Sequence, residues 1–389
     1  MIDFKKGEVS FGAIVATLGA ILIALGIAWF MALNWHEIHS ALKIVILVFF
    51  TVGAYFSGVL FRINDYEKIG GSLLVLGALL YTLSIFLIAQ IFSTEASIQG
   101  IAFLLLLAWV GILFASYIFG SSFSLVIALI EFLIWISFQF FAFVEIFDGD
   151  FSIGILVIIY LLVGVGFYGL TQIHKSRGSD FAQVYRFWTA FYVLLLTYIL
   201  SFQTFLVMLW PAGFSLSGGI LIFLIAMFFI SVILAIIGIS MSVNSGKLTS
   251  NEVFGFVGLV FLYILLIALT GLFSGDISSL LGRGSLSGGL WAMWLFDNIL
   301  FIFVILSVIG YGTRYKSSKI VSLAISFFAL DVITRYIGFI MDFGGYLGAA
   351  MISILGGIIL IAGGWGLEKW RKRLIKRTEQ KTEAGYAVY

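Results

Sequence analysis

Twelve runs of about 20 mostly apolar residues follow one another along the chain, and they limit its fold more than any other feature. Each run can cross a hydrocarbon core of ~30 Å as an α-helix, because a helix rises about 1.5 Å per residue. Strands of a transmembrane β-barrel would instead appear as ~10-residue segments of alternating polarity. The sequence therefore predicts an all-α, polytopic transmembrane helix bundle. The predicted spans are 11–33, 41–61, 69–92, 98–119, 121–141, 151–170, 187–210, 217–243, 253–273, 290–310, 320–341 and 345–366.

Domain organisation follows from these runs. We expect a short cytoplasmic N-terminus at 1–10, a single transmembrane helical domain at 11–366 and a basic cytoplasmic tail at 367–389. The run 11–33 is too long for the apolar part of a signal peptide, so it is interpreted as the first span. Between 98–119 and 121–141, only Gly120, Ser121 and Ser122 offer a break that divides the two spans.

Composition excludes several classes of protein. Only 10% of the residues are charged, whereas about a quarter are charged in soluble domains. A net charge of +2, with no basic stretch interleaved with aromatic residues outside the spans, gives no indication of nucleic-acid binding. The chain has no cysteine, which excludes disulfides and cysteine-ligated metal centres.

The distribution of basic residues predicts the orientation. With a cytoplasmic N-terminus and twelve spans, all but three of the 21 lysines and arginines fall in cytoplasmic segments. The exceptions are Lys43 and Arg335, which lie in spans, and Arg283 in an outer loop. The positive-inside rule therefore favours cytoplasmic N- and C-termini, in the cytoplasmic membrane of a prokaryote.

Four charged residues inside predicted spans form the first candidate site. Asp331 and Arg335 lie one helical turn apart on one face of the span 320–341, while Glu131 and Asp297 lie in two other spans. Measured from the cytoplasmic ends, Glu131 and Asp331 are about 15–16 Å deep, and Asp297 and Arg335 about 20–22 Å. Because charges at such depths face the bundle interior and find partners there, we expect an intramembrane polar cluster.

This cluster has two interpretations. One is a structural ion pair, with Asp297 or Asp331 beside Arg335, that fixes helix packing. The other is a functional site. If the three carboxyls and one guanidinium cluster, at least one carboxyl must carry a proton, or a cation must join the group. The second interpretation describes a proton-coupled carrier.

A second polar concentration lies at the predicted outer ends of the spans 11–33 and 69–92. It comprises Asn34, Trp35, His36, Glu37 and Gln90. With His39, the residues His36 and Glu37 offer metal-ligand chemistry, but zinc sites need three or four convergent ligands and no fourth is evident. An interfacial turn beside Trp35 is the preferred interpretation, and we predict no metal and no cofactor.

Motifs that would indicate an enzyme are missing from the sequence: we find no G-x-S-x-G, no H-E-x-x-H and no phosphate-binding loop. We therefore predict a protein that is not an enzyme, with a carrier-like role as the leading hypothesis. A membrane scaffold or lipid-interacting protein is the first alternative, and an intramembrane enzyme the second. The expected partners are membrane lipids and a small solute or proton, and no nucleic acid.

Two stretches carry a resemblance to a known family. They are LGAILIALGIAWFMALNW at 18–35 and LGALLYTLSIFLIAQIF at 76–92. Together they resemble the multi-pass membrane proteins of bacteria and archaea classed as domain-of-unknown-function family 2157. The stretch 330–372, with Asp331 and Arg335, is similar to the ends of longer members. The resemblance, strongest over 11–92 and 320–372, implies a membrane helix bundle and supplies no activity.

Overall fold

The computed structural model describes residues 11–33, 37–92, 97–147, 152–210, 216–272 and 288–343, together with the single positions 357, 365 and 369. These residues form helices joined by turns and contain no strand. The helices are α1 (Phe11–Leu33), α2 (Ser40–Ile63), α3 (Glu67–Phe92), α4 (Ile98–Ile118), α5 (Ser122–Ile146), α6 (Ile153–Arg177), α7 (Phe181–Leu200), α8 (Gln203–Met208), α9 (Gly218–Asn244), α10 (Ser250–Leu272), α11 (Gly288–Arg314) and α12 (Ser318–Phe343).

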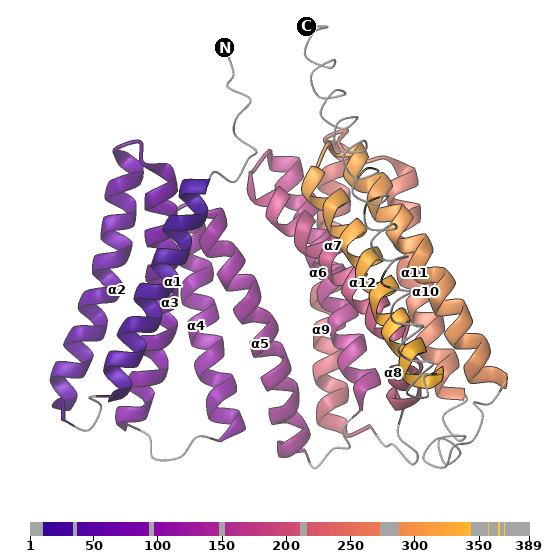
Figure 1. Ribbon diagram of the computed structural model, residues 1–389, viewed down its shortest axis with the longest axis horizontal. Coiled ribbons are helices and arrows are strands. Elements are labelled where there is room, and N and C mark those ends of the chain that lie inside the picture. Colours follow the sequence, from indigo (N-terminus) through magenta and orange to yellow (C-terminus); the bar gives the residue numbers. More distant parts are fainter. Residues whose placement is uncertain are drawn as a thin grey trace, which may run out of the picture. The chain divides into compact units, whose positions relative to one another are not determined.

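The chain divides into two compact units (Figure 1). Unit 1 comprises Met1–Gly149 with Ser217–Ile220, and therefore contains α1 to α5. Unit 2 comprises Asp150–Leu216 with Leu221–Tyr389, and contains α6 to α12 apart from the first turn of α9. The predicted bounds of a single helical domain, 11–366, stay a prediction.

Among the described helices, nine are long and apolar enough to cross a membrane by length and composition: α1 to α6 and α9 to α11. Their surfaces agree with this, as α2 illustrates. One face of α2 buries Leu47 and Ala54, while Val45, Phe49 and Phe56 on the other face are 61%, 70% and 64% exposed. Lipid is the environment in which such an apolar surface is stable. The count of twelve spans stays a prediction, and the last of them, 345–366, lies outside the described residues apart from Gly357 and Trp365.

In unit 1, α2 and α3 pack tightly because their crossing is lined by glycine. A Cβ atom added at Gly70 of α3 would lie 2.6 Å from the carbonyl oxygen of Gly58 on α2. Small residues of this kind let helix backbones approach closely in membranes. The predicted break between α4 and α5 is present, since Gly120 has φ +59° and the Ser121 side chain caps α5 by accepting from the Ser124 amide.

In unit 2, the core lies between α7, α10, α11 and α12. It includes the fully buried Leu194 and Leu200 of α7, Leu266 of α10, Phe301 of α11 and Val321 of α12. Helix α7 packs against α6, α11 and α12, so its side chains meet neighbours on several sides.

The predicted span 187–210 is wrong as a single helix. Helix α7 ends at Leu200, and α8 begins at Gln203 after the residues Ser201 and Phe202. The physical reason is that the Ser201 carbonyl accepts hydrogen bonds from side chains of other helices instead of from the following turn of its own helix.

The segment that follows the break is held at its far end. The carbonyl oxygen of Leu209, just after α8, accepts from the Gly154 amide at 2.9 Å and from the Ser152 hydroxyl at 2.7 Å at the start of α6. The indole of Trp210 donates to the carbonyl oxygen of Ile267 on α10 at 3.1 Å. Helix α8 is therefore fixed to α6 and α10.

Candidate functional site

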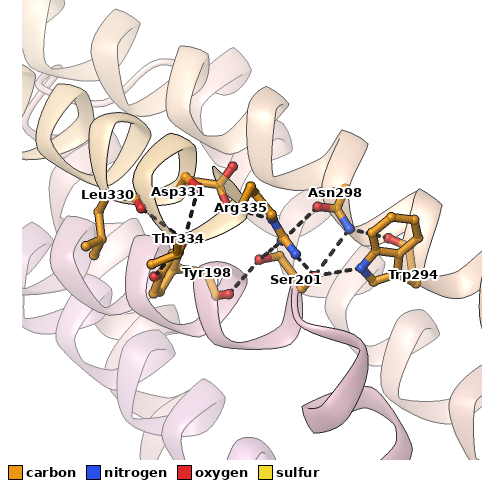
Figure 2. A network of polar contacts seen from close by, with 8 residues as sticks. All are labelled: Tyr198, Ser201, Trp294, Asn298, Leu330, Asp331, Thr334 and Arg335. Carbon is orange, nitrogen blue, oxygen red and sulfur yellow. Dashed lines mark hydrogen bonds and ion pairs between the residues drawn. The ribbon is translucent and has the colours of Figure 1, made fainter. Parts of the chain in front are cut away.

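The candidate site in unit 2 surrounds the break after α7, and we call it the Ser201 cluster: Ser201, Trp294, Asn298, Asp331 and Arg335. The Ser201 carbonyl oxygen accepts from Trp294 Nε1 at 2.9 Å, from Asn298 Nδ2 at 3.3 Å and from Arg335 Nη2 at 2.8 Å. Figure 2 shows these donors reaching Ser201 from α11 and α12. The Ser201 carbonyl lies beyond the end of α7, so these three donors satisfy an acceptor that its own helix leaves open.

Arg335 is the centre of the Ser201 cluster. Its Nη2 atom also lies 2.6 Å from the Ser201 hydroxyl and 2.9 Å from Asn298 Oδ1, and its Nε donates to Asp331 Oδ1 at 3.2 Å. Its guanidinium stands 4.7 Å above the ring of Phe202. A cation at this position also complements the negative end of the α7 dipole. The ion pair of Arg335 in the described structure is therefore with Asp331, one turn away on α12.

Asp297 lies beside the Ser201 cluster but takes no part in its hydrogen bonds. The side chain is completely buried, and within the described part of the chain neither carboxylate oxygen has a hydrogen-bond partner. It is close enough to Arg335 on α12 and Tyr263 on α10 to interact electrostatically with both. A buried carboxylate without a partner is costly unless it carries a proton or gains a cation.

Glu131, the fourth predicted member, belongs to α5 of unit 1. It is 6% exposed, and its Oε1 accepts a hydrogen bond from the Thr82 hydroxyl on α3. Its Oε2 has no hydrogen-bond partner among the described residues. In the structure, Asp331 and Arg335 are thus in contact and Asp297 is near them. Glu131 belongs to the other unit.

The predicted outer motif is only partly described. Asn34, Trp35 and His36 lie outside the described residues, Glu37 is exposed in the turn before α2, and Gln90 is exposed near the end of α3. His39 is the N-cap of α2, where its Nδ1 accepts from the Ala41 amide at 3.3 Å. This contact gives His39 a structural role. In the described ranges, no three acidic or histidine residues are grouped as metal ligands would be.

A second polar network, which sequence reasoning missed, joins helix ends in unit 2. Glu252 at the start of α10 accepts from the Tyr315 hydroxyl and from Gln172 Nε2 at 3.3 Å, and lies 4.0 Å from Lys175 Nζ. Burial, and then the hydrogen bond with Glu252, raises the pKa of Tyr315, so the phenol stays protonated and donates. We call these residues, with Arg186, Lys247 and Arg314 around them, the Glu252 network.

The sequence did contain a signal for the Glu252 network. Glu252 is the single acidic residue between Asp180 and Asp276, and the basic residues around it were interpreted only as orientation signals. A lone carboxylate at a helix start, among basic helix ends predicted on the same side, indicates a contact between those ends.

Comparisons with known proteins support the membrane assignment. No curated protein and no solved structure matches the chain. One family model matches residues 3–125, and this match does not include the stretch 320–372. Together with the nine apolar helices among the described residues, it makes the chain a membrane protein of unknown function. The matching model is that of DUF2157, a family of predicted membrane proteins, which confirms the family resemblance over the N-terminal part of the chain.

Proposed function

We propose that the chain is a carrier-like integral membrane protein whose solute site is the Ser201 cluster, with Asp297 as a proton-binding group. One observation carries the proposal: the helix break at Ser201 presents unwound backbone to the partly buried guanidinium of Arg335. Carriers are often built on such discontinuous helices, which place backbone and charged groups at a binding site. The proposal assigns no catalytic residue and no cofactor.

The chemistry of the site suggests an anionic or carbonyl-bearing small solute. The hydrogen bonds described for Arg335 use Nε and Nη2, and within the described residues Nη1 makes none. A guanidinium with a donor in reserve binds carboxylates well. Uptake of a proton at Asp297 then offsets the negative charge that the solute brings.

Access of water to the cluster tests the carrier proposal. The chain has no cysteine, so Thr334→Cys and Phe202→Cys each introduce one thiol beside Arg335. We expect both to react with a small impermeant thiol reagent from either side of sealed vesicles, because a carrier exposes its site alternately. Ser231→Cys, at a buried serine of α9, is the control and should not react. Reaction from one side only, or from neither, would contradict a carrier.

A second candidate, a lipid-interacting membrane protein, is favoured by a cavity in unit 1. The cavity has a volume of about 570 Å³ and lies between α2, α3 and α4. Val52, Phe56 and Phe114 are among its lining residues, and the hydroxyl-bearing side chains are those of Tyr55 and Tyr81. An apolar cavity of this size accommodates a lipid tail better than a charged solute.

The proposed location is the cytoplasmic membrane of a prokaryote, with both termini inside. Glu37 and Glu67 are exposed and flank the two ends of α2, so they make a matched pair for labelling. In whole cells, Glu37→Cys should react with an impermeant reagent and Glu67→Cys should react only after lysis. The reverse pattern would invert the proposed orientation.

A further inference from the structure

Basic side chains from four separate segments converge at the Glu252 network. Lys175 lies in the last turn of α6, Arg186 is in α7, Lys247 precedes α10, and Arg314 is the last residue of α11. Lys175 Nζ and the Arg186 guanidinium stand 4.6 Å and 4.1 Å from the centre of the Tyr315 ring. Arg186, Lys247 and Arg314 are all close enough to Lys175 to repel it electrostatically.

The network contains too few carboxylates to balance these cations. Glu252 is already engaged by Tyr315, Gln172 and Lys175. Lys247 donates to the carbonyl oxygens of Lys175 and Ser176 at 3.0 and 3.1 Å, and Arg314 donates to the Thr249 hydroxyl at 2.9 Å. Within the described ranges, neither Lys247 nor Arg314 forms an ion pair with a carboxylate. The four basic residues thus leave an excess of positive charge, which an anion would neutralise.

The position of the network indicates the kind of anion. Lys247 and Arg314 are exposed at the helix ends, where a membrane helix meets the headgroup region. On the outer face of α10, away from Glu252, Phe254 and Val257 are 75% and 53% exposed and offer an apolar surface. A phosphate group accepts from arginine and lysine with good geometry, and in a phospholipid it is joined to acyl chains that such a surface can accommodate.

We propose that Lys247 and Arg314, with Lys175 and Arg186 behind them, form a binding site for the phosphate group of an anionic phospholipid. This site lies on helix ends and is separate from the Ser201 cluster, so it does not rest on the proposed carrier function. A soluble phosphate compound shares the same chemistry. The exposed apolar side chains of Phe254 and Val257 on α10 favour the lipid.

Lipid-dependent stability tests the proposal. The protein, purified in a non-ionic detergent, is heated with added phosphatidylglycerol, with phosphatidylcholine or with inorganic phosphate, and its unfolding temperature is measured. We expect phosphatidylglycerol to raise the unfolding temperature and the other two to leave it unchanged. A rise with inorganic phosphate alone would overturn the proposal in favour of a soluble phosphate ligand.

Variants connect the effect to the named residues. In the double variant Lys247→Gln with Arg314→Gln, the phosphatidylglycerol concentration needed for half of the rise should increase about fivefold for each basic residue removed. Lys68→Gln, which changes an exposed lysine of unit 1, is the matched control and should keep the wild-type response. Native mass spectrometry of bound lipid gives a second readout, independent of any change in lipid-free stability. An unchanged response in the double variant would overturn the proposal.

Discussion

Arg335→Gln is expected to destabilise the detergent-solubilised protein by about 1.5–3 kcal/mol, the range for losing hydrogen bonds to a charged group, because the Arg335 side chain is partly buried. The guanidinium holds three groups that would otherwise lack a charged donor: the Ser201 carbonyl, the Asn298 side-chain oxygen and the Asp331 carboxylate. Glutamine is too short and has too few donors to replace these bonds together. The measurement is the free energy of unfolding, or the unfolding temperature in a fixed detergent.

Three companion variants separate the contributions of charge and geometry. Arg335→Lys should lose part of the same stability, because an ammonium keeps the charge but not the planar fork. Asp331→Asn should cost about 1 kcal/mol or less, since this pair is partly exposed and Arg335 keeps its bonds to Ser201 and Asn298. Asp297→Asn should cost nothing, because no described group bonds to that carboxyl. A loss at Asp297→Asn as large as that at Arg335→Gln would identify Asp297 as the true partner.

Gly70→Leu is expected to have the largest effect in unit 1. The first atom of any side chain at this position would meet the Gly58 carbonyl oxygen at 2.6 Å and the Arg62 backbone nitrogen at 2.9 Å. These are backbone atoms of α2, so the clash is relieved only if α2 and α3 move apart. Overpacking of this kind costs roughly 1–3 kcal/mol, and more where backbone must shift.

The matched control for Gly70→Leu is Gly53→Leu on α2. A Cβ atom at Gly53 would find nothing within 4 Å, so the substitution should be neutral or slightly stabilising through helix propensity. Unfolding temperatures of the two variants, measured in the same detergent, provide the comparison. Equal effects would show that α2 and α3 are not packed through Gly70.

Local sequence patterns predicted the features that depend on one segment. The break at Gly120 was predictable because glycine and a capping serine act within their own turn. A spacing of four residues placed Asp331 and Arg335 on one helix face, although the sequence left Asp297 as an alternative partner for Arg335. The predicted span 151–170 is shorter than α6, which extends to Arg177 because a helix continues beyond the hydrocarbon core into the interface.

Features that depend on distant segments could not be predicted in this way. The break at Ser201 is stabilised by donors about 90 to 130 positions further along the chain, at Trp294, Asn298 and Arg335. The run 187–210 contains no glycine and no proline, since Pro211 follows its end. It therefore has the composition of a continuous helix. The Glu252 network joins α6, α10 and α11: the lone carboxylate among basic helix ends indicates a contact there, but the sequence does not reveal which helices are adjacent.

The two attachments of α8 restrict how unit 2 can move. At one end Ser201 is bonded to α11 and α12, and at the other Leu209 and Trp210 are bonded to α6 and α10. A six-residue helix attached at both ends is expected to move as a rigid body. Changes in backbone dihedral angles are then confined to the non-helical residues Ser201 and Phe202. Loss of the Arg335 contacts to Ser201 would therefore detach this end of α8 from α12, while Trp294 and Asn298 would keep it bonded to α11.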